Sequence, residues 1–424
     1  MPSSLAVIGA GWAGLAAAVE AVKAGWSVTL FEMAEQAGGR ARDVHDERHV
    51  LDNGQHILIG AYVETLRLMR EVGVNPQAVL LRTPLRLTEP DGRGLHLPAG
   101  PPLMAFAVAA WRRVGWTPGE RLALLAAAGG WALRGFRCPP DWTVGRLTRD
   151  LPEALRRDLI DPLCVAALNT PASEASATVF LRVLRDALFS GQGSADLLLP
   201  RASLGELFPA PALAWLRERG ATVRLSTRVQ RLDQFGVQWR IDGETFDAVV
   251  LATPPGEAAR LAAAVAPAWS AGSEAFRYEP IVTVYADAGA TRLPEPMLAL
   301  PPGPNAPAQF VFDRGQLGGP AGLLAFVISG AQPWVDAGRD ATIEATLAQA
   351  REALRDHLRG DLRPVRTIAE KRATFRCVPG LQRPPAAIAP RLAAAADYVA
   401  GPYPATIEGA VRSAVQAVAM LTMS

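Results

Sequence analysis

The stretch VIGAGWAGLAAA, residues 7–18, contains Gly9, Gly11 and Gly14 in the spacing G-x-G-x-x-G. It continues the apolar run of residues 5–8, which we expect to form a buried β-strand. Gly9 permits a tight turn, Gly11 lets the backbone approach a pyrophosphate, and Gly14 lets the next helix pack against the strand. This combination predicts a strand–turn–helix unit that binds a phosphorylated ligand.

The residues that follow extend this unit. An Ala-rich helix is expected to begin at Trp12 and Ala13, so that its first backbone N–H groups point toward a bound phosphate. A second strand, residues 27–31, leads directly to Glu32, at the distance from the glycines where an acid binds a ribose hydroxyl. Strand, glycines, helix, strand and acid together predict a dinucleotide site.

Gly38, Gly39 and Arg40 follow at a spacing typical of flavoproteins. The arrangement resembles the amine oxidase and phytoene desaturase superfamily, in which the double glycine carries the chain past the cofactor and the arginine lies near its phosphates. The resemblance implies FAD as the cofactor. Because no second G-x-G-x-x-G occurs downstream, we expect no separate NAD(P)H domain and an external, unidentified electron donor.

The closing segment ADYVAGPYPATIEGAV, residues 396–411, resembles the C-terminal flavin segment of the same superfamily. Asp397 matches the Asp that contacts the diphosphate–ribityl region, although Ala396 stands where the family usually has Gly. Thr406 and Ile407 are expected to begin a helix whose positive end faces the flavin and stabilises negative charge there.

The pattern predicts an α/β protein. Its FAD-binding domain would be Rossmann-like, of the glutathione reductase or amine oxidase type, beside a mixed sheet-plus-helix substrate domain. Helix–strand alternation stops after residue 80 and returns before Val229, whose backbone is expected to contact the adenine. We expect the FAD-binding domain to comprise residues 1–80, 195–265 and 375–424, and the substrate domain residues 81–194 and 266–374.

Two further segments narrow the family. LDNGQHILIGAY (51–62) and DPLCVAALNTPASEASATVF (161–180) resemble the squalene-associated FAD-dependent enzymes called hydroxysqualene dehydroxylases, and FDRGQLGG (312–319) fits the same group. The resemblance implies an enzyme, an FAD-dependent oxidoreductase. Its substrate would be the long-chain isoprenoid hydroxysqualene, reduced to squalene in squalene and hopanoid biosynthesis.

The segment 51–62 is expected to pass the flavin, with FAD contacts from Asn53, Gly54, Gln55 and His56. Replacing an allylic C–OH by C–H requires a hydride from FAD, a proton for the departing oxygen and a dry apolar cleft. Candidate proton donors are His56, which we favour, Asp52, Tyr403 and Glu408. In the competing interpretation Asp52, Gln55 and His56 only bind FAD or each other.

Other functions remain open at this level. A carotenoid (phytoene-type) desaturase has the same fold and the opposite electron flow, and other amine-oxidase-like oxidoreductases share the motifs. Many amine oxidases hold a lysine near the flavin, however, and the strand PIVTVYA, residues 280–286, has none. A prenyl-binding chaperone of the Rab escort type has the fold without FAD, but the intact segment around Asp397 argues against it.

Composition excludes several classes of partner. The net charge is +2, and the basic residues are scattered arginines apart from Lys23 and Lys371, so no nucleic-acid footprint is expected. Three cysteines lie far apart without a C-x-x-C, which predicts neither a metal site nor a disulfide framework and fits the cytoplasm. No run of 18 apolar residues occurs, so a spanning helix is not expected.

Residues 101–140 are unusually apolar. Thr117 and Glu120 form a capping-box pattern with a proline at the first helical position, before a helix that is uncharged over residues 122–133. Three tryptophans and flanking arginines suit an interfacial helix pair, and thus peripheral contact with the inner face of the cytoplasmic membrane. A buried lid over the substrate cavity is the alternative interpretation.

Overall fold

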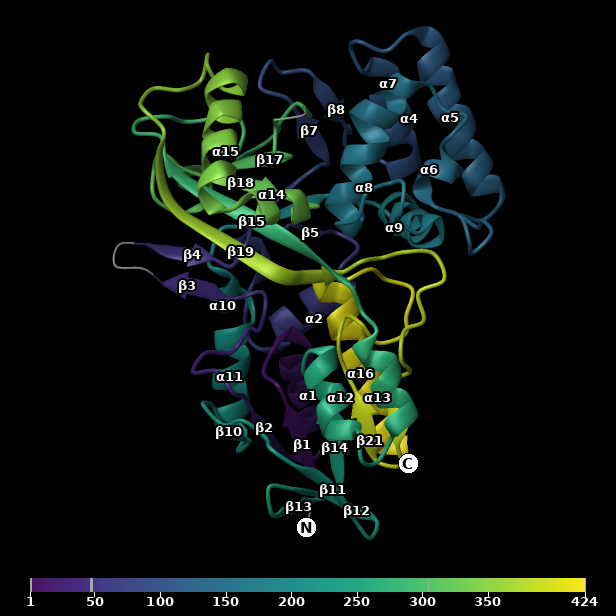
Figure 1. Cartoon of the computed structure of the whole chain (residues 1–424), viewed down its shortest axis with the longest axis vertical. Coiled ribbons are helices and arrows are strands. Elements are labelled where there is room, and N and C mark those ends of the chain that lie inside the picture. The colour runs from purple at the N-terminus through teal and green to yellow at the C-terminus, as the bar shows by residue number, and fades with distance from the viewer. Residues whose placement is uncertain (1, 46–48, 304, 424) are drawn as a thin grey trace.

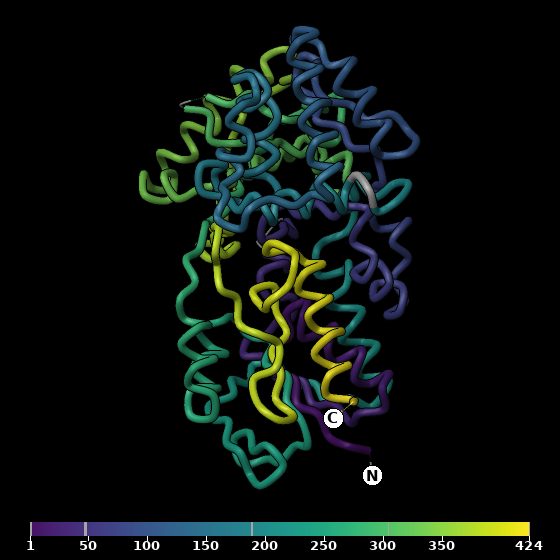
Figure 2. Tube along the Cα trace, turned by 90° about the vertical axis from the view of Figure 1, so that its right-hand side faces the viewer, coloured from purple at the N-terminus to yellow at the C-terminus, as the bar shows by residue number. Residues whose placement is uncertain are grey.

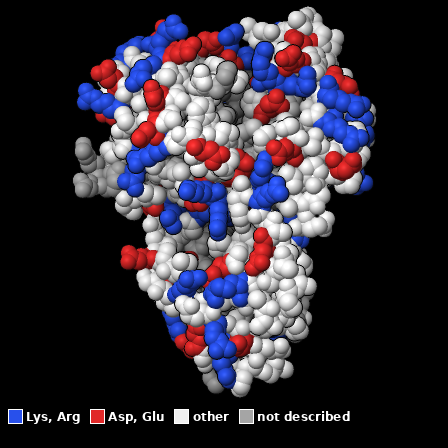
Figure 3. Space-filling model, in the orientation of Figure 1, with Lys and Arg blue, Asp and Glu red and all other residues white. Residues whose placement is uncertain are grey.

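The computed structural model describes residues 2–45, 49–303 and 305–423. It has a lower lobe that contains both chain ends and an upper lobe in which a sheet and a group of helices lie side by side (Figure 1). Positive and negative side chains alternate over the face seen in Figure 3, in keeping with the small net charge.

A six-stranded sheet forms the centre of the lower lobe. Its strands, in spatial order, are β10 (Thr222–Arg224), β2 (Ser27–Phe31), β1 (Ser4–Ile8), β14 (Ala248–Leu251), β21 (Leu392–Ala394) and β20 (Ala387–Ala389). All neighbours are parallel except β20 and β21. Ile8 pairs with Phe31 and Leu251, so the carboxyl ends of these strands meet at one edge, where parallel sheets bind ligands.

Both faces of this sheet are covered. Leu5 and Val7 pack against one layer, while Ala6 and Ile8 pack against the other, as the alternation of a strand requires. The first layer contains α1 (Trp12–Lys23), α2 (Val63–Glu71), α11 (Pro209–Glu218) and α16 (Ile407–Met423). The second contains α12 (Pro255–Ala262), α13 (Pro267–Glu274) and the meander β11 (Leu232–Phe235), β12 (Gln238–Ile241) and β13 (Glu244–Phe246). Figure 2 shows α16 beside the N-terminal elements, and α16 packs on α1.

The upper lobe contains an antiparallel sheet. Its order is β16 (Met297–Ala299), β17 (Phe310–Asp313), β18 (Leu323–Ile328), β15 (Tyr278–Asp287) and β19 (Arg363–Phe375). The helices α14 (Gln332–Ala337) and α15 (Arg339–Ala353) lie beside it. Val284 and Phe326 pack toward α15, whereas Tyr285 and Ala325 belong to a separate cluster with Leu51 on the opposite face. That second face therefore meets the segment that follows the cofactor motif.

Further short elements lie at the joint between the lobes or within one of them. They are β3 (Asp43–His45), β4 (Val50–Asp52), β5 (Leu58–Ile59), α3 (Pro76–Val79), β6 (Leu80–Thr83), β7 (Arg86–Thr88), β8 (Gly94–His96), β9 (Leu197–Pro200), α10 (Leu204–Leu207) and the 3-10 helix η2 (Arg314–Leu317). β9 lies between β5 and β6 and ties residues 58–83 to residues 197–200.

The remaining helices form what we call the helical cap, residues 102–189. It comprises α4 (Pro102–Arg112), α5 (Pro118–Leu133), α6 (Val144–Leu147), α7 (Glu153–Leu155), the π-helix η1 (Arg156–Ile160), α8 (Asp161–Leu168) and α9 (Ala177–Phe189). The capping box of Thr117 and Glu120 is confirmed in both directions. Within the described residues, no helix is both long and apolar enough to cross a bilayer.

One expectation needs correction. Of the three tryptophans within residues 101–140, only Trp111 is exposed, at 51%, because Trp116 and Trp131 point into the apolar core.

Candidate active site

The turn between β1 and α1 is built from glycines for two different reasons. Gly9 has φ +103°, and a Cβ there would lie 2.5 Å from the carbonyl oxygen of Ala252; a Cβ on Gly14 would overlap the carbonyl oxygen of Gly9. A Cβ on Gly11 would instead meet nothing closer than Gly39 Cα at 3.9 Å. The protein's own packing requires Gly9 and Gly14, whereas a small residue at Gly11 suits the close approach of a ligand.

The double-glycine loop lies directly against this turn. Gly11 and Gly38 form a β-bridge, the Gly38 N–H donates to the Ala10 carbonyl at 2.8 Å, and Gly39 has φ +61°. No side chain caps α1 at Gly11, so no capping side chain competes for the first helical amides, including that of Ala13. Two glycine segments beside an uncapped helix N-terminus fit a pyrophosphate.

The Trp12 side chain makes its contacts within the protein. Its indole Nε1 donates to the Ala41 carbonyl at 3.0 Å, and its ring centroid lies 5.2 Å from that of Phe208. Only the Trp12 backbone is therefore available to a phosphate at the start of α1.

Glu32 lies at the end of β2, as expected, and its carboxylate is fixed by the backbone. One oxygen accepts from the Ala10 N–H at 2.7 Å and the other from the Ala34 N–H at 2.9 Å. The Thr227 N–H donates to the Glu32 carbonyl, which brings the segment containing Val229 to the same edge. The Val229 carbonyl itself accepts from Arg260 at 2.8 Å.

Arg40 and Asp397 join the first and last segments of the site. Arg40 Nη2 lies 2.6 Å from Asp397 Oδ1, and Arg40 Nη1 donates to the Ala373 carbonyl at 2.8 Å. Arg383 supports the closing turn by donating to the carbonyls of Asp397, Val399, Gly401 and Tyr403. Sequence reasoning missed Arg383, since nothing in its neighbourhood marks it.

The start of α16 is fixed in two ways. The Thr406 hydroxyl oxygen accepts from the Gly409 N–H at 3.1 Å, just before the helix begins at Ile407. The fully buried Glu408 accepts from the Thr65 N–H at 2.9 Å, the Thr65 hydroxyl at 2.7 Å and Arg412 Nε at 2.7 Å, and more weakly from the Glu64 N–H. Glu408 therefore caps α2, and these bonds give it a structural role.

Tyr403 lies between two arginines. Its hydroxyl oxygen accepts from Arg182 Nη2 at 3.3 Å, and the guanidinium groups of Arg182 and Arg412 lie 5.0 and 5.4 Å from its ring centroid. Burial raises the pKa of Tyr403, and Asp186 acts in the same direction. The phenol is consequently neutral at ordinary pH.

The Asp52 carboxylate faces the joint between the lobes. Its Oδ1 accepts from the Leu204 N–H at 2.8 Å, and its Oδ2 lies 3.7 Å from Arg314 Nη2. Desolvation raises the pKa of Asp52 to about 6, against the Leu204 amide and Arg314, which lower it. The Tyr285 hydroxyl donates to the Asp52 carbonyl at 2.9 Å, so this residue connects β4 to the upper sheet.

Residues 53–55 present polar groups with and without partners. Asn53 Nδ2 donates to the Arg40 carbonyl at 3.0 Å and to Glu370 Oε2 at 3.2 Å. Both amide atoms of Gln55 are buried and have no hydrogen-bond partner, and the buried Thr283 hydroxyl also has none. A Cβ on Gly54 would lie 3.8 Å from Thr283 Oγ1. Gln55 and Thr283 are therefore available to bind a cofactor or substrate.

Sequence reasoning did not select Thr283. The available signal was its place in PIVTVYA, the strand on which many amine oxidases hold a lysine. The structure shows that this strand approaches the segment 52–56 at Gly54 and Tyr285.

His56 lies in the same loop, with its Nδ1 3.2 Å from the Gly54 carbonyl. Burial lowers the pKa of His56; the Gly54 hydrogen bond opposes this effect and the charge of Arg40 adds to it. The neutral ring then donates from Nδ1, which leaves Nε2 as an acceptor. This state disfavours the proton-donor role that we favoured for His56, and the identity of the donor stays a prediction.

The glycine turn, Glu32 and the Arg40–Asp397 pair lie at the carboxyl edge of a parallel sheet, an arrangement that fits an FAD-binding protein. The sequence profile of the family described as "Flavin containing amine oxidoreductase" matches residues 12–421. The chain belongs to this family and, within it, to the group that includes the hydroxysqualene dehydroxylases. The predicted cofactor, enzyme class and fold class are thereby confirmed.

Individual relatives support this assignment. The chain is 30% identical to a hydroxysqualene dehydroxylase of Sinorhizobium fredii over 97% of both chains. A zeta-carotene desaturase of Synechocystis is 39% identical, but over only 16% of this chain and 14% of its own. Cyclohexylamine oxidase from Brevibacterium oxydans shares the fold, with a TM-score of 0.71 at 16% identity, covering 100% of this chain and 99% of its own.

Proposed function

We propose that this enzyme replaces the hydroxyl group of hydroxysqualene by hydrogen and so produces squalene for squalene and hopanoid biosynthesis. The observation that carries this proposal is similarity to a hydroxysqualene dehydroxylase over 97% of both chains. Similarity to a carotenoid desaturase is confined to 16% of the chain, which makes desaturation the second candidate.

The overall change balances in electrons and protons. The allylic C–O bond breaks, the oxygen leaves as water after taking a proton, and the carbon receives a hydride. FAD, when bound in its reduced form, supplies that hydride, and an external donor must reduce it again.

The chain's own residues position the reactants and exclude water. Gln55 and Thr283 offer buried hydrogen-bonding atoms, and neutral His56 offers an acceptor. Apolar side chains of this loop and of the adjoining upper sheet, among them Ile57 and Ile281, pack in one cluster that keeps the surroundings of the loop dry.

We also propose peripheral contact of the helical cap with the inner face of the cytoplasmic membrane. Six large apolar side chains of α4, α5 and their link are exposed: Leu103, Met104, Trp111, Val114, Leu122 and Leu133. The nearby Arg112, Arg134 and Arg137 are exposed as well. Apolar side chains beside cations suit the surface of an anionic bilayer, from which a water-insoluble substrate would come.

An anaerobic assay tests the reaction. Photoreduced protein mixed with hydroxysqualene should regain the spectrum of oxidised flavin while one squalene forms per flavin. If the flavin stays reduced, no squalene appears and the oxidised protein desaturates phytoene-like substrates, the desaturase is the correct function.

A further inference from the structure

The antiparallel sheet of the upper lobe ends in β19, a long edge strand that carries several positive charges. Arg366, Lys371 and Arg372 lie on this strand and are exposed, and we call these three cations the basic edge. The ion pairs among the described residues include none of the three, whereas Arg376, just beyond the strand, pairs with two glutamates. In Figure 3, positive side chains gather near the middle of the face, where β19 crosses it in Figure 1.

A bulge separates two of these cations from the regular strand pairing. Residues 371–373 of β19 face the single residue Pro280 of β15, and regular pairing resumes on either side. Proline has no N–H to donate, so the ladder breaks at this point. Positive charges at a sheet edge protect it from pairing with other strands, and this accounts for Arg366. Bulges also redirect side chains beside functional sites, so Lys371 and Arg372 call for a further explanation.

The bulge contacts both chain segments that are expected to bind FAD. Arg40 Nη1 donates to the Ala373 carbonyl, within the bulge, at 2.8 Å. Asn53 Nδ2 donates to Oε2 of Glu370, the residue before the bulge, at 3.2 Å. The bulge cations therefore lie within one or two residues of contacts to both segments. A redox protein bound at these cations would lie close to the cofactor, as electron transfer requires.

The carboxylates beside the bulge already have partners. Glu370 accepts from Asn53 and from the backbone N–H of Arg372 at 3.1 Å, and Asp397 pairs with Arg40. The exposed charge at the bulge is consequently positive, and it would attract a negatively charged partner.

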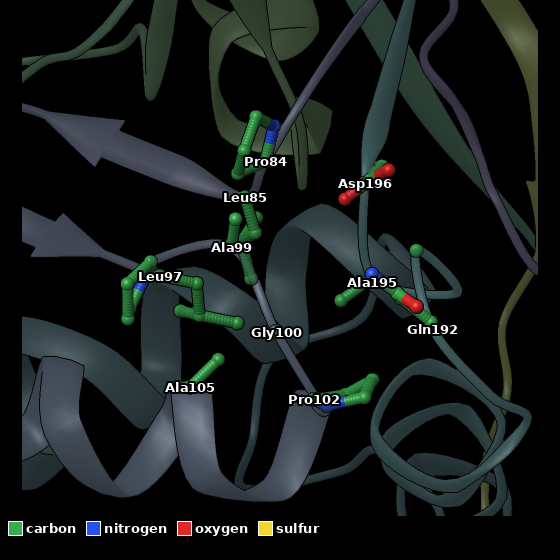
Figure 4. A pocket seen from close by; sticks show the side chains of 12 residues that line it. Pro84, Leu85, Leu97, Ala99, Gly100, Pro102, Ala105, Gln192, Ala195 and Asp196 are labelled. Carbon is green, nitrogen blue, oxygen red and sulfur yellow. The ribbon is translucent and has the colours of Figure 1, made fainter.

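The hollow shown in Figure 4 is a different kind of site. It lies between the residues before α4 and the loop that precedes β9, and Asp196, which lines it, pairs with Arg82 at 2.7 Å. None of the basic-edge residues lines this hollow. The sequence also has no second dinucleotide motif that would hold a nicotinamide donor. An exposed, positively charged strand edge suits the surface of a protein partner instead.

We propose that the basic edge docks an acidic electron-carrier protein that reduces the bound FAD. This inference rests on the proposed function in its need for an external reductant. Two one-electron carriers lose one electron each, and oxidised FAD takes up these two electrons and two protons to give its reduced form. Opposite charges accelerate the encounter of such partners, and redox pairs commonly form small interfaces.

Binding is tested with an oxidised plant-type ferredoxin, an acidic one-electron carrier. Lys371→Glu combined with Arg372→Glu should weaken its binding to the holoenzyme by about tenfold or more, and salt should weaken its binding to wild type. Arg351→Glu combined with Arg355→Glu reverses the same charge at exposed residues of the same lobe and should change Kd much less. Flavin content and Tm establish that each variant is folded. Lys371→Glu alone replaces the first double variant if that protein does not fold.

The rate of flavin reduction separates docking from dehydroxylation, because no isoprenoid is present. Reduced ferredoxin, mixed anaerobically with wild-type holoenzyme, should bleach the flavin absorbance, and it should do so about tenfold more slowly in the variant with Lys371→Glu and Arg372→Glu. Photoreduction should proceed equally in both proteins, which shows that the flavin site is intact. Reduction by ferredoxin without turnover of hydroxysqualene would retain the docking surface and reject the reaction.

Three results would overturn the docking surface. The first is equal ferredoxin binding and equal reduction in both double variants, and the second is ferredoxin binding without reduction of the flavin. The third is reduction by NADPH alone at the rate that ferredoxin gives. If reversal of Lys371 and Arg372 abolishes binding to phosphatidylglycerol vesicles but not to ferredoxin, the basic edge belongs to a membrane surface instead.

Discussion

Arg40 and Asp397 form an ion pair of 2.6 Å although 357 residues separate them in the chain. Arg40 ends the double-glycine loop, and Asp397 begins the closing turn, in which Arg383 donates to five carbonyls of residues 397–403. The pair therefore closes the cofactor region between its first and last segments. Contacts of this kind make FAD binding sensitive to both ends of the chain.

Gly11→Leu should abolish FAD retention in a protein that still folds. A Cβ at Gly11 meets no protein atom closer than 3.9 Å, so the new side chain would occupy the pyrophosphate path without disturbing the packing. The measurement is the flavin-to-protein absorbance ratio together with circular dichroism. Gly119→Leu, at an open position in α5, is the control. Unchanged flavin content in folded Gly11→Leu protein would refute the site.

Glu408→Gln should destabilise the protein by about 2–3 kcal/mol because it replaces a buried acceptor by a group that also presents N–H donors to α2. Thr65→Val, which removes one donor to the same carboxylate, should cost about 1 kcal/mol. Turnover per bound flavin should remain within about threefold of wild type, since other candidates supply the proton. If Glu408→Gln instead leaves the free energy of unfolding unchanged but loses most of its turnover per bound flavin, Glu408 is the proton donor.

Asp52 should give the unfolding free energy a distinctive pH dependence. Desolvation raises its pKa from 3.8 to about 6, so the folded protein binds this proton more tightly than the unfolded chain does. The contribution of Asp52 to stability therefore falls as pH rises from about 4 to about 6, by roughly 3 kcal/mol. Urea unfolding of wild type and Asp52→Asn across this range should show the slope only in wild type. If the free energy of unfolding changes with pH equally in both proteins, the raised pKa of Asp52 is contradicted.

His56 should not control turnover as an acid. Because burial lowers its pKa from 6.5, the ring is neutral at pH 7 and above, and kcat should not fall tenfold per pH unit in that range. Protonation of the buried ring is unfavourable in the folded state, so the free energy of unfolding should decrease as pH falls below about 6.5. Rate profiles of wild type and His56→Ala, both with flavin bound, provide the test. A falling limb that His56→Ala removes, with a loss of about 10²–10⁴-fold, would restore His56 as the donor.

The exposed side chains of the helical cap should bind anionic lipid. Wild-type protein should float with vesicles that contain phosphatidylglycerol, and salt should weaken the binding because arginines contribute to it. Replacing Trp111, Leu122 and Leu133 by Ser should release a protein that retains FAD. Phe235→Ser and Val237→Ser, at exposed apolar residues of the β11–β12 hairpin, are the control. If wild type never floats, the cap is only a lid.

The sequence predicts best what neighbouring residues determine. The strand over residues 27–31 has the expected bounds, because it is a compact run with clear limits. The capping box of α5 depends on two residues three positions apart and is likewise confirmed.

Contacts between distant segments were beyond sequence reasoning. The partners of Asp52, Glu408 and Asn53 lie 152, 343 and 317 residues away, at Leu204, Thr65 and Glu370. Trp131 was expected at an interface and is buried, because in a helix with apolar residues on most sides the pattern does not say which side faces the core. Hence the fold and the cofactor could be predicted, but the roles of the polar residues required the structure.

The order of strands in the lower sheet has a consequence for synthesis of the protein. β21 pairs with β14, although β21 and the closing turn are synthesised long after β14. Until then the nascent chain has neither Asp397 beside Arg40 nor α16 against α1, and the edge of β14 is unpaired. Flavin capture that uses the Arg40–Asp397 pair must therefore wait for this late segment, and chaperones have an exposed strand edge to protect until then.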